Sequence, residues 1–596
     1  MEDMWVLSNR SLQASGVSAL DLNSCNSASL SANPWDSLEN PGPTEYAATR
    51  AHDILSTFNL LVTRRILEIM VTATNLEGLR KRGNDWKMTD VTELRGYLGL
   101  LPLAGVHRSR NEALESLWHE ESGRAIFRGT MLLKRFHALS RVLQFDDHET
   151  RGAKRASDKL PAIREVWDAW VRELPRLYNP GPDVTVDEQL VPFRGRCSFR
   201  QYMPSKPARY GLKSWVACDA GSSYAWNMQV YTGKSVSGEP ERNQGARVVM
   251  DLTKRLRGHR NVTCNNFFTS YELARRLLHD RDLTVVGTMR KNKPELPHAL
   301  LYTKGRAVFS SSLAFTPTVT LVSYVPKRNR NVVLLSTLHT GDASTAAKPD
   351  IILHYNSTRG GVDNLDKLVG TYSCRRKTAR WPLALFHNIL DVSAYNAFVL
   401  WRELRPEWLC GKLNRRRAFL EQLGRVLVTP LIERRSRLPR TQVSAALVKA
   451  VAARSCEPRS GAGVRRVRQD QRGDEEEDEE DKNDEQDDEE EAAPRAPRVP
   501  SKRKRCQLCP KKKDRDTQRV RWLPEIRLRE VHTALLRGLR ETVASRLARR
   551  FELRLCLYAA HKKKQPATST FQCNKGPGDP RDTSRHEASS ERQKCH

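Results

Sequence analysis

Long apolar runs are absent from this chain, and so is a leader-like N-terminus. No stretch approaches the roughly 18 apolar residues that a membrane-spanning helix needs. The segment Met1–Asn40 has early acids and many Ser and Asn residues, without the apolar core of a signal peptide. We therefore expect neither secretion nor a membrane partner.

Cysteine is scarce and irregularly spaced. The chain has 12 cysteines in 596 residues. Cys197, Cys218, Cys264 and Cys374 fall in segments that read as core strands or helices, not in the spaced pairs of a disulfide framework. This distribution favours reduced thiols inside a cell.

Acidic residues are in deficit except in one place. The chain carries 101 Lys and Arg residues against 70 Asp and Glu, a formal net charge of +31. From Asp474 to Glu491, however, 15 acids face Lys482 alone, so the rest of the chain is more basic than the net charge indicates. Such an excess favours a polyanionic partner through phosphate neutralisation, and nucleic acid is the first expectation.

Helical periodicity dominates the first third of the chain. Apolar residues recur at helical spacing from His52 to Thr74. Asp90 and Glu93 have the spacing of a capping pair and predict a second helix directly after them. Further helical patterns cover residues 131–143 and 160–177. This part of the chain is predicted to be all-α.

The pattern changes at Asp183. Alternating runs rich in β-branched and aromatic residues predict strands in 184–192, 213–231, 261–266 and 283–289, with helices in 247–256 and 271–279 between them. Helical patterns return at 360–371 and 382–404. Strands that alternate with helices in this order are typical of an α/β mixed sheet flanked by helices.

Composition predicts the boundaries of the remaining segments. Residues 1–44 have little periodicity and are expected to be disordered. The expected segments after them are a helical domain (45–180), an α/β core in two parts (181–290 and 351–405), a β-rich insertion (291–350), a basic helical region (406–468), an acidic and Pro-rich linker (469–501) and a basic tail with an amphipathic helix (502–596).

Several motifs recur in a fixed order between Thr44 and Leu404. The first is V-D-E-Q-L-V-P-F-R-G-R (186–196), which continues through Y-M-P-S-K-P (202–207) and Y-G-L-K (210–213). The others are D-K-L (158–160), G-G-V-D-N-L-D (360–366), S-C-R-R-K-T (373–378) and R-W-P (380–382). Together they resemble the transposase domain of piggyBac elements, including the domesticated piggyBac-derived proteins of animals.

The resemblance implies a fold, an activity and a set of site residues. It implies a ribonuclease-H-like catalytic core interrupted by an insertion, preceded by a helical domain for dimerisation and DNA binding. A homodimer of this kind cuts element ends and joins them to double-stranded DNA at TTAA targets. The family's three essential aspartates would fall at Asp187, position 265 and Asp363, with Asp366 as an auxiliary carboxylate.

Carboxylates are needed at these positions because magnesium is a hard ion that prefers oxygen ligands. Paired metal ions activate the attacking water or 3′-hydroxyl and stabilise the leaving oxygen. We expect Asp187, Asp363 and Asp366 to hold magnesium or manganese. Asp363 and Asp366 are three residues apart and share one face of the predicted helix.

Asn265 departs from the family pattern. An amide oxygen can ligate magnesium, but it neither neutralises the ion nor bridges two metals as a carboxylate does. Each loss of roughly 1.4 kcal/mol in transition-state stabilisation costs tenfold in rate. The sequence therefore predicts a weakened metal site and impaired DNA cleavage.

Basic side chains beside the motifs are the predicted DNA contacts. One group lies near the first aspartate and another follows the third. The predicted contacts are Arg194, Arg196, Arg200, Lys206, Lys213, Arg375, Arg376, Lys377 and Arg380. Such residues would position the DNA through its phosphates without reading its sequence.

The tail carries part of a second family feature. Cys506 and Cys509, preceded by K-R-K-R (502–505), resemble the opening of the cysteine-rich zinc domain of many piggyBac proteins. A structural zinc site needs four ligands, and no further Cys follows until Cys556. Unliganded thiols therefore explain the pair as well as zinc does. The basic run could be a nuclear-import signal or a solvated charge cluster.

The combined reading is a domesticated or decaying piggyBac-derived nuclear protein that binds DNA, with DNA recombination as its ancestral activity. Two alternatives stay open. In one, the chain is an active transposase in which Asp187, Asp363, Asp366 and the Asn265 carbonyl hold the metal. In the other, it is a chromatin-interaction protein that relies on its acidic tract and C-terminal helix.

Overall fold

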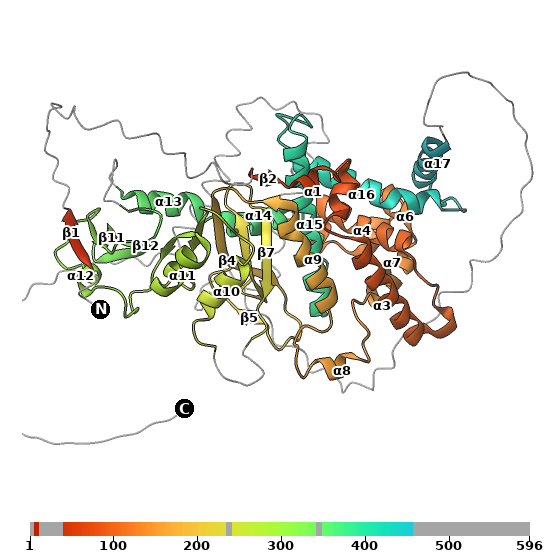
Figure 1. Cartoon of the computed structure of the whole chain (residues 1–596). Coiled ribbons are helices and arrows are strands. Elements are labelled where there is room, and N and C mark those ends of the chain that lie inside the picture. Colours follow the sequence, from red (N-terminus) through yellow and green to blue (C-terminus); the bar gives the residue numbers. More distant parts are fainter. Residues whose placement is uncertain (1–4, 11–39, 234–240, 341–347, 457–596) are drawn as a thin grey trace, which may run out of the picture. The chain divides into compact units, whose positions relative to one another are not determined.

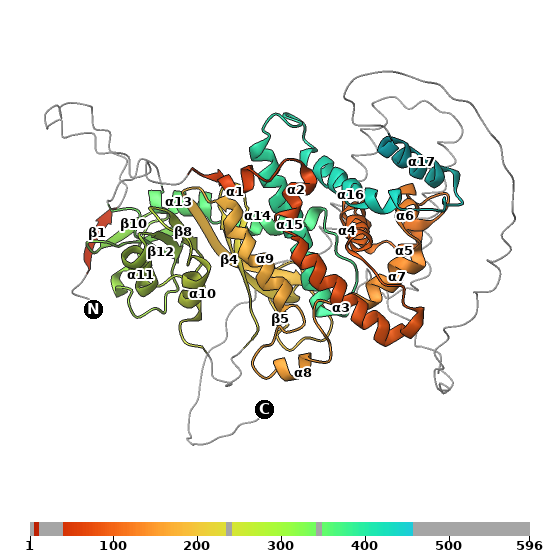
Figure 2. The ribbon, with the colours of Figure 1, turned by 45° about the vertical axis from the view of Figure 1, so that its right-hand side comes forward.

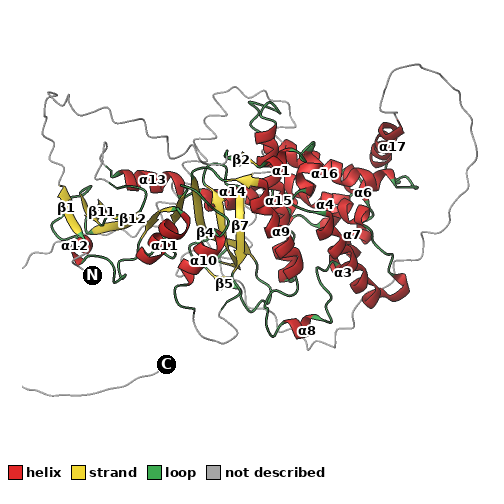
Figure 3. Cartoon of the chain, in the orientation of Figure 1, coloured by secondary structure: helices red, strands yellow, loops and turns green. Residues whose placement is uncertain are grey.

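The computed structural model describes residues 5–10, 40–233, 241–340 and 348–456 (Figure 1). The expectations for the acidic linker and for Cys506 and Cys509 lie outside the described residues. The disorder expected over 1–44 is wrong for two short stretches, because Val6–Arg10 and Gly42–Pro43 form strands. Within the described residues the fold is mixed α/β, as the sequence predicts, with many helices and a mixed sheet (Figure 3).

The first part of the chain is helical. Its helices are α1 (Glu45–Ala48), α2 (Ile54–Asn59), α3 (Arg64–Arg82), η2 (Gly83–Asp85), α4 (Val91–Val106), η3 (Ser109–Asn111), α5 (Leu114–Trp118), α6 (Ala125–Thr130), α7 (Leu133–Val142), α8 (Arg151–Lys154) and α9 (Arg164–Leu177). A short two-stranded sheet, β2 (Gly42–Pro43) with β3 (Tyr178–Asn179), brings the two ends of this part together.

Capping residues set the boundaries of these helices. The single helix expected over 52–74 is two helices, because Asp53 forms a capping box with Ser56 and Thr63 caps a new start for α3. The start predicted at Asp90 is confirmed, since its carboxylate accepts from Glu93 N at 2.8 Å. The Glu93 side chain does not return to Asp90, because it binds a guanidinium instead.

The large sheet contains all the other strands. They are β1 (Val6–Arg10), β4 (Asp183–Pro192), β5 (Gln201–Tyr202), β6 (Tyr210–Asp219), β7 (Ala225–Val230), β8 (Asn261–Cys264), β9 (Thr284–Thr288), β10 (Ser311–Phe315), β11 (Thr320–Lys327) and β12 (Arg330–Ser336). The strand order is β1-β10-β11-β12-β9-β8-β4-β6-β5, and β7 pairs with β6. The central strands β4, β8 and β9 are parallel to one another, whereas the flanking pairs are antiparallel.

The β-rich segment expected as an insertion continues the core sheet. Strand β12 pairs with β9, the last parallel strand, and β11 and β10 follow by antiparallel pairing. Strand β1 pairs with β10 and is the edge strand on that side of the sheet (Figure 1).

The later helices pack on this sheet and on the helical part. They are α10 (Gln244–Leu252), α11 (Tyr271–Arg281), α12 (His298–Leu301), α13 (Asp350–Thr358), α14 (Gly361–Thr371), α15 (Trp381–Leu404), α16 (Arg415–Glu433) and α17 (Gln442–Cys456). Helix α14 packs on β4 and β6, whereas α16 packs along α4 (Figure 2). Gly99 and Gly424 permit that close approach, because a Cβ on Gly424 would lie 3.1 Å from the Gly99 carbonyl oxygen.

Helix α15 is long and apolar enough to cross a membrane by length and composition, with a mean hydropathy of 1.3 in its most apolar window. That window is 94% buried inside the protein. The helix contacts α2, β2, β4, α14 and α16. It therefore has the setting of a core helix.

Candidate active site

Strand register brings Asp187 and Asn265 side by side. Strands β4 and β8 are parallel and pair Val186 with Cys264. The next residue on each chain is Asp187 on β4 and Asn265 directly after β8. Because parallel strands keep one register, the two side chains meet, and Asn265 Nδ2 donates to Asp187 Oδ1 at 2.7 Å.

The amide of Asn265 has a defined orientation. Its nitrogen also donates to Glu188 Oε2 at 3.2 Å. Its oxygen accepts the backbone N–H of Phe267 at 2.8 Å. The backbone donor fixes the direction of the amide, because only the oxygen can accept from it. The oxygen that could ligate a metal therefore points at the backbone, and N–H groups face the carboxylates.

Asp187 and Glu188 form a coupled acidic pair. Burial raises the pKa of Asp187, and the neighbouring Glu188 carboxyl raises it further. Burial also acts to raise the pKa of Glu188, but the hydrogen bond with Asp187 and the charge of Lys213 outweigh it and bring that pKa below its ordinary value. Burial and the neighbouring carboxyl therefore favour the protonated form of Asp187 over that of Glu188.

Asp363 is positioned by the connection between α13 and α14. Thr185 on β4 donates to the carbonyl oxygen of Thr358, the last residue of α13, at 2.6 Å. At Gly361, the first residue of α14, a Cβ would lie 2.6 Å from Thr185 Oγ1. Only glycine allows this approach, so α14 begins tightly against β4 and places Asp363 in its first turn.

Lys206 is the ion-pair partner of Asp363. Its Nζ lies 2.9 Å from Asp363 Oδ1. The lysine side chain is 15% exposed and the aspartate 68%. Burial acts to lower the pKa of Lys206, but the contact with Asp363 and the charges of Asp187 and Asp366 raise it overall. The ammonium group stays protonated and lies among the predicted catalytic acids.

Asp366 is held by an amide relay. Gln189 Nε2 donates to Asp366 Oδ1 at 2.7 Å, and Asn388 Nδ2 donates to Gln189 Oε1 at 2.8 Å. Burial raises the pKa of Asp366 to about 6, although the Gln189 hydrogen bond and the charge of Lys206 oppose the rise. The relay links β4, α14 and α15.

A cavity of about 420 Å³ lies beside these acids. Asp363, Asp366 and Lys206 line it, together with Arg110 and Arg375. Asp187 and Asn265 are not among its lining residues. Asp363 and Asp366, which were predicted to share one face of a helix, thus line the same cavity.

The donor set does not fit a pair of divalent cations in this arrangement. Within the described residues, no group of three or more His, Cys, Asp and Glu side chains is placed to hold a metal ion. Asn265 already donates hydrogen bonds to Asp187 and Glu188, and the ammonium of Lys206 pairs with Asp363. Magnesium needs converging oxygen atoms instead. The magnesium site expected at Asp187, Asp363 and Asp366 is therefore not preformed.

The predicted DNA-contacting cations differ in whether their side chains are held inside the protein or exposed. Two of them brace the fold: Arg376 donates to the carbonyl oxygens of Ser109 and Glu112 at 2.5 and 2.8 Å, and Arg380 donates to several carbonyl oxygens at the end of α7. Burial lowers the pKa of both arginines. Their guanidinium groups are therefore occupied inside the protein.

The other predicted cations differ in exposure. Arg200 is exposed and donates to the carbonyl oxygens of Arg194 and Gly195. Lys213 Nζ lies 4.8 Å from the Phe267 ring centroid, and burial lowers its pKa. A final group consists of the exposed residues Arg194, Arg196 and Lys377 and the half-buried Arg375.

The sequence did not reveal Glu188, Gln189 and Asn388 as members of the site. Glu188 and Gln189 are part of the D-E-Q motif, which was a signal that could have found them. Asn388 lies in an apolar helical run and gave no comparable signal. Its partner Gln189 is 199 residues away in the sequence.

Known proteins are similar to this chain. A family model described as transposase IS4 matches residues 55–398. The chain is similar to the human piggyBac transposable element-derived protein 3, with 23% identity over 391 residues that cover 59% of this chain and 62% of that protein. It is also similar to the human chimeric ERCC6-PGBD3 protein, with 23% identity and coverage of 59% and 34%. The chain thus spans less than two thirds of either relative.

A solved structure is also similar. It is a cryo-EM structure of a piggyBac transposase synaptic complex with hairpin DNA, at 31% identity and a TM-score of 0.66. The likeness covers 72% of this chain and 90% of that one. Because the family model matches more than half of the chain and the solved transposase is covered almost entirely, the chain belongs to the piggyBac-type transposase family.

Proposed function

We propose that this chain is a nuclear DNA-binding protein derived from a piggyBac transposase, with a ribonuclease-H-like core whose strand cleavage is impaired. The ancestral reaction is cut-and-paste DNA transposition at TTAA sites. The observation that carries the proposal is the orientation of Asn265. Its amide nitrogen faces Asp187 and Glu188, and its oxygen is taken by the Phe267 backbone.

The same observation weighs against an active enzyme that uses the Asn265 carbonyl as a metal ligand. That role would require the amide to turn over. The turn would leave the Phe267 N–H without its acceptor and would place a second oxygen against the carboxylates. We propose that magnesium or manganese binds weakly, if at all.

DNA binding is supported by the exposed cations beside the site and by the relative solved with hairpin DNA. Arg194, Arg196 and Lys377 are free to reach phosphate groups. Arg110 and Arg375 add positive charge at the cavity beside Asp363. We propose double-stranded DNA as the partner and a homodimer as the DNA-binding form.

A donor-cleavage assay tests the loss of catalysis. The purified chain is incubated with DNA carrying piggyBac-type ends and either magnesium or manganese, beside the Asn265→Asp variant. We expect no cleavage by the unaltered chain and measurable cleavage by the variant. An Asn265→Asp/Asp363→Asn double variant is the control and should again be inactive. Robust double-strand cutting by the unaltered chain would overturn the proposal.

A further inference from the structure

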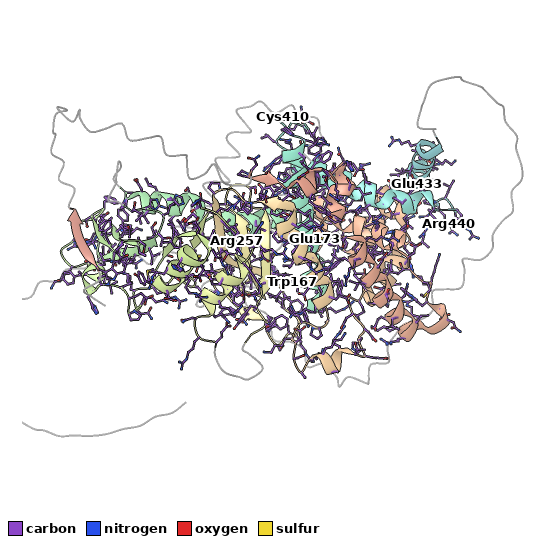
Figure 4. The ribbon with its side chains drawn as sticks, in the orientation of Figure 1. Trp167, Glu173, Arg257, Cys410, Glu433 and Arg440 are labelled. Carbon is purple, nitrogen blue, oxygen red and sulfur yellow. The ribbon has the colours of Figure 1, made fainter. Side chains whose placement is uncertain are left out.

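A groove on the helical part lies outside the site described above. It has a volume of about 810 Å³ and is formed by the η2–α4 junction, the α6–α7 junction and the end of α16. Figures 1 and 2 show α4, α6, α7 and α16 gathered there. Figure 4 labels Glu433 and Arg440, which bracket the connection after α16 that forms one wall. We call this feature the helical groove.

Two large apolar side chains in the helical groove are exposed to solvent. Met88 is 56% exposed and Leu132 is 65% exposed. They come from different junctions, Met88 ahead of α4 and Leu132 ahead of α7. Exposed apolar groups that gather in a concave surface mark a binding site more often than isolated ones do.

The groove is also rich in positive charge. Arg82, Lys87 and Arg437 line it and form no ion pair with any acid in the described part of the chain, whereas Asp85 is an unpaired acid at the same rim. Arg82, Lys87 and Arg437 outnumber Asp85, so the groove favours an anionic ligand.

The other acids of the groove are already neutralised. Glu93 binds Arg135 through both carboxylate oxygens, at 2.8 and 2.6 Å, and the Arg135 guanidinium lies over the Trp86 ring at 4.6 Å from its centroid. Asp90 binds Arg434 at the end of α16. These ion pairs fix the walls of the groove in place without cancelling the charges of Arg82, Lys87 and Arg437.

The start of α7 adds a further positive feature. The helix has 10 residues and begins after Leu132, which provides no side-chain hydrogen bond to the first turn. The first N–H groups of a helix need an acceptor and carry a partial positive charge. Because Leu132 lines the groove, a carboxylate bound there could supply that acceptor beside an apolar contact.

We propose that the helical groove binds an acidic protein segment that presents apolar residues between its carboxylates. The carboxylates would meet Arg82, Lys87 and Arg437 and the start of α7, and the apolar residues would cover Met88 and Leu132. Duplex DNA fits this surface less well, because its phosphates offer nothing to cover the two apolar side chains. The inference does not depend on the proposed DNA binding or on the loss of cleavage.

A binding assay with a defined probe tests the proposal. The probe is a fluorescein-labelled helical peptide built from Glu and Leu, and its matched controls replace either Glu by Gln or Leu by Ser. Fluorescence anisotropy with the full chain should show binding of the Glu–Leu peptide only. Equal binding of either control peptide, or no binding of the probe, would overturn the proposal.

Variants of the groove locate the binding. Met88→Ser/Leu132→Ser and Arg82→Glu/Arg437→Glu should each weaken peptide binding by about tenfold or more, since a few central residues carry most of an interface's affinity. Leu353→Ser and Arg328→Glu alter exposed residues on α13 and the β11–β12 turn and should change the affinity by less than about twofold. All substituted residues are exposed, so the thermal midpoints should match that of the unaltered chain.

A second readout separates the possible occupants. Hydrogen exchange with the bound peptide should show protection in 85–90, 131–135 and 434–437, and protection elsewhere alone would overturn the proposal. A short duplex DNA is measured on the same variants. If Arg82→Glu/Arg437→Glu weakens DNA binding and leaves peptide binding unchanged, the groove is a DNA surface and the proposal is wrong.

Discussion

Asn265 Nδ2 lies 2.7 Å from Asp187 Oδ1, within hydrogen-bond distance. The parallel register of β4 and β8 fixes this contact. An amide at this position stabilises a buried carboxyl pair that would otherwise repel, because it donates to both acids. A carboxylate in its place needs a bound cation for the same purpose.

Asn265→Asp should therefore make the site depend on metal. The change removes the donated hydrogen bonds and adds a negative charge beside Asp187 and Glu188. We expect the free energy of unfolding without metal to fall by about 1–3 kcal/mol. Manganese should restore part of the loss, because binding to the native state alone raises stability. Thermal unfolding with and without manganese measures both effects.

Asn266→Asp is the matched control for that charge. Asn266 is exposed and directly follows Asn265. The same charge placed there should change stability by less than about 0.5 kcal/mol and should create no response to manganese. An equal manganese response in the unaltered chain would contradict the inference that the site is not built for metal.

The sequence predicted the main elements but not how they end or join. Apolar spacing predicted one helix over 52–74, because periodicity continues through the four residues that separate α2 from α3. The signals for the break were local, namely the caps at Asp53 and Thr63. The pairing of β12 with β9 joins distant segments, and hydropathy does not encode it.

For the site too, the sequence predicted the main members but not all of their contacts. The motifs predicted Asp187, position 265 and Asp363 as one site, and the structure brings Asn265 against Asp187. Charge alone could not separate an exposed cation such as Lys377 from a half-buried one such as Arg380, since both are basic residues in neighbouring motifs. The Lys206–Asp363 pair links residues 157 apart and depends on the turn that carries Lys206.

Gly361→Ala should displace the start of α14. The new Cβ would lie 2.6 Å from Thr185 Oγ1 and 3.0 Å from Thr185 Cβ, and the buried strand cannot yield easily. Overpacking of this kind costs about 1–3 kcal/mol. We expect a lower thermal midpoint and weaker contact between Lys206 and Asp363.

Gly370→Ala is the control on the same helix. At Gly370 a Cβ meets nothing within 4 Å, so the change should be neutral or stabilise by up to about 1 kcal/mol through helix propensity. A Thr185→Ala/Gly361→Ala double variant removes the clashing hydroxyl. Its loss should be smaller than the sum of the two single losses; additive losses would place the strain elsewhere.

Lys377 and Arg380 should separate DNA binding from folding. Lys377 is exposed, so Lys377→Ala should weaken DNA binding, reduce the slope of log affinity against log salt by about one, and leave the thermal midpoint unchanged. Arg380→Gln breaks charged hydrogen bonds to carbonyl oxygens near α7 and should lower the free energy of unfolding by about 2 kcal/mol or more. A loss of stability in Lys377→Ala would mean that it too braces the fold.

Asp391 should make the stability of the protein depend on pH between about 4 and 6, and Asp391→Asn should remove this dependence. Its carboxylate accepts from Ser373 Oγ at 2.5 Å and Cys374 N at 2.8 Å, yet burial raises its pKa from 3.8 to about 6. The folded protein therefore holds this proton more tightly than the unfolded chain does. The contribution to stability is complete below about pH 4, falls as the pH rises to about 6, and is constant above that, with a slope of at most about 1.4 kcal/mol per pH unit. Thermal midpoints of the two proteins from pH 4 to 7 should show the unaltered chain losing stability relative to Asp391→Asn as the pH rises to about 6; a constant difference across that range would mean that Asp391 titrates normally.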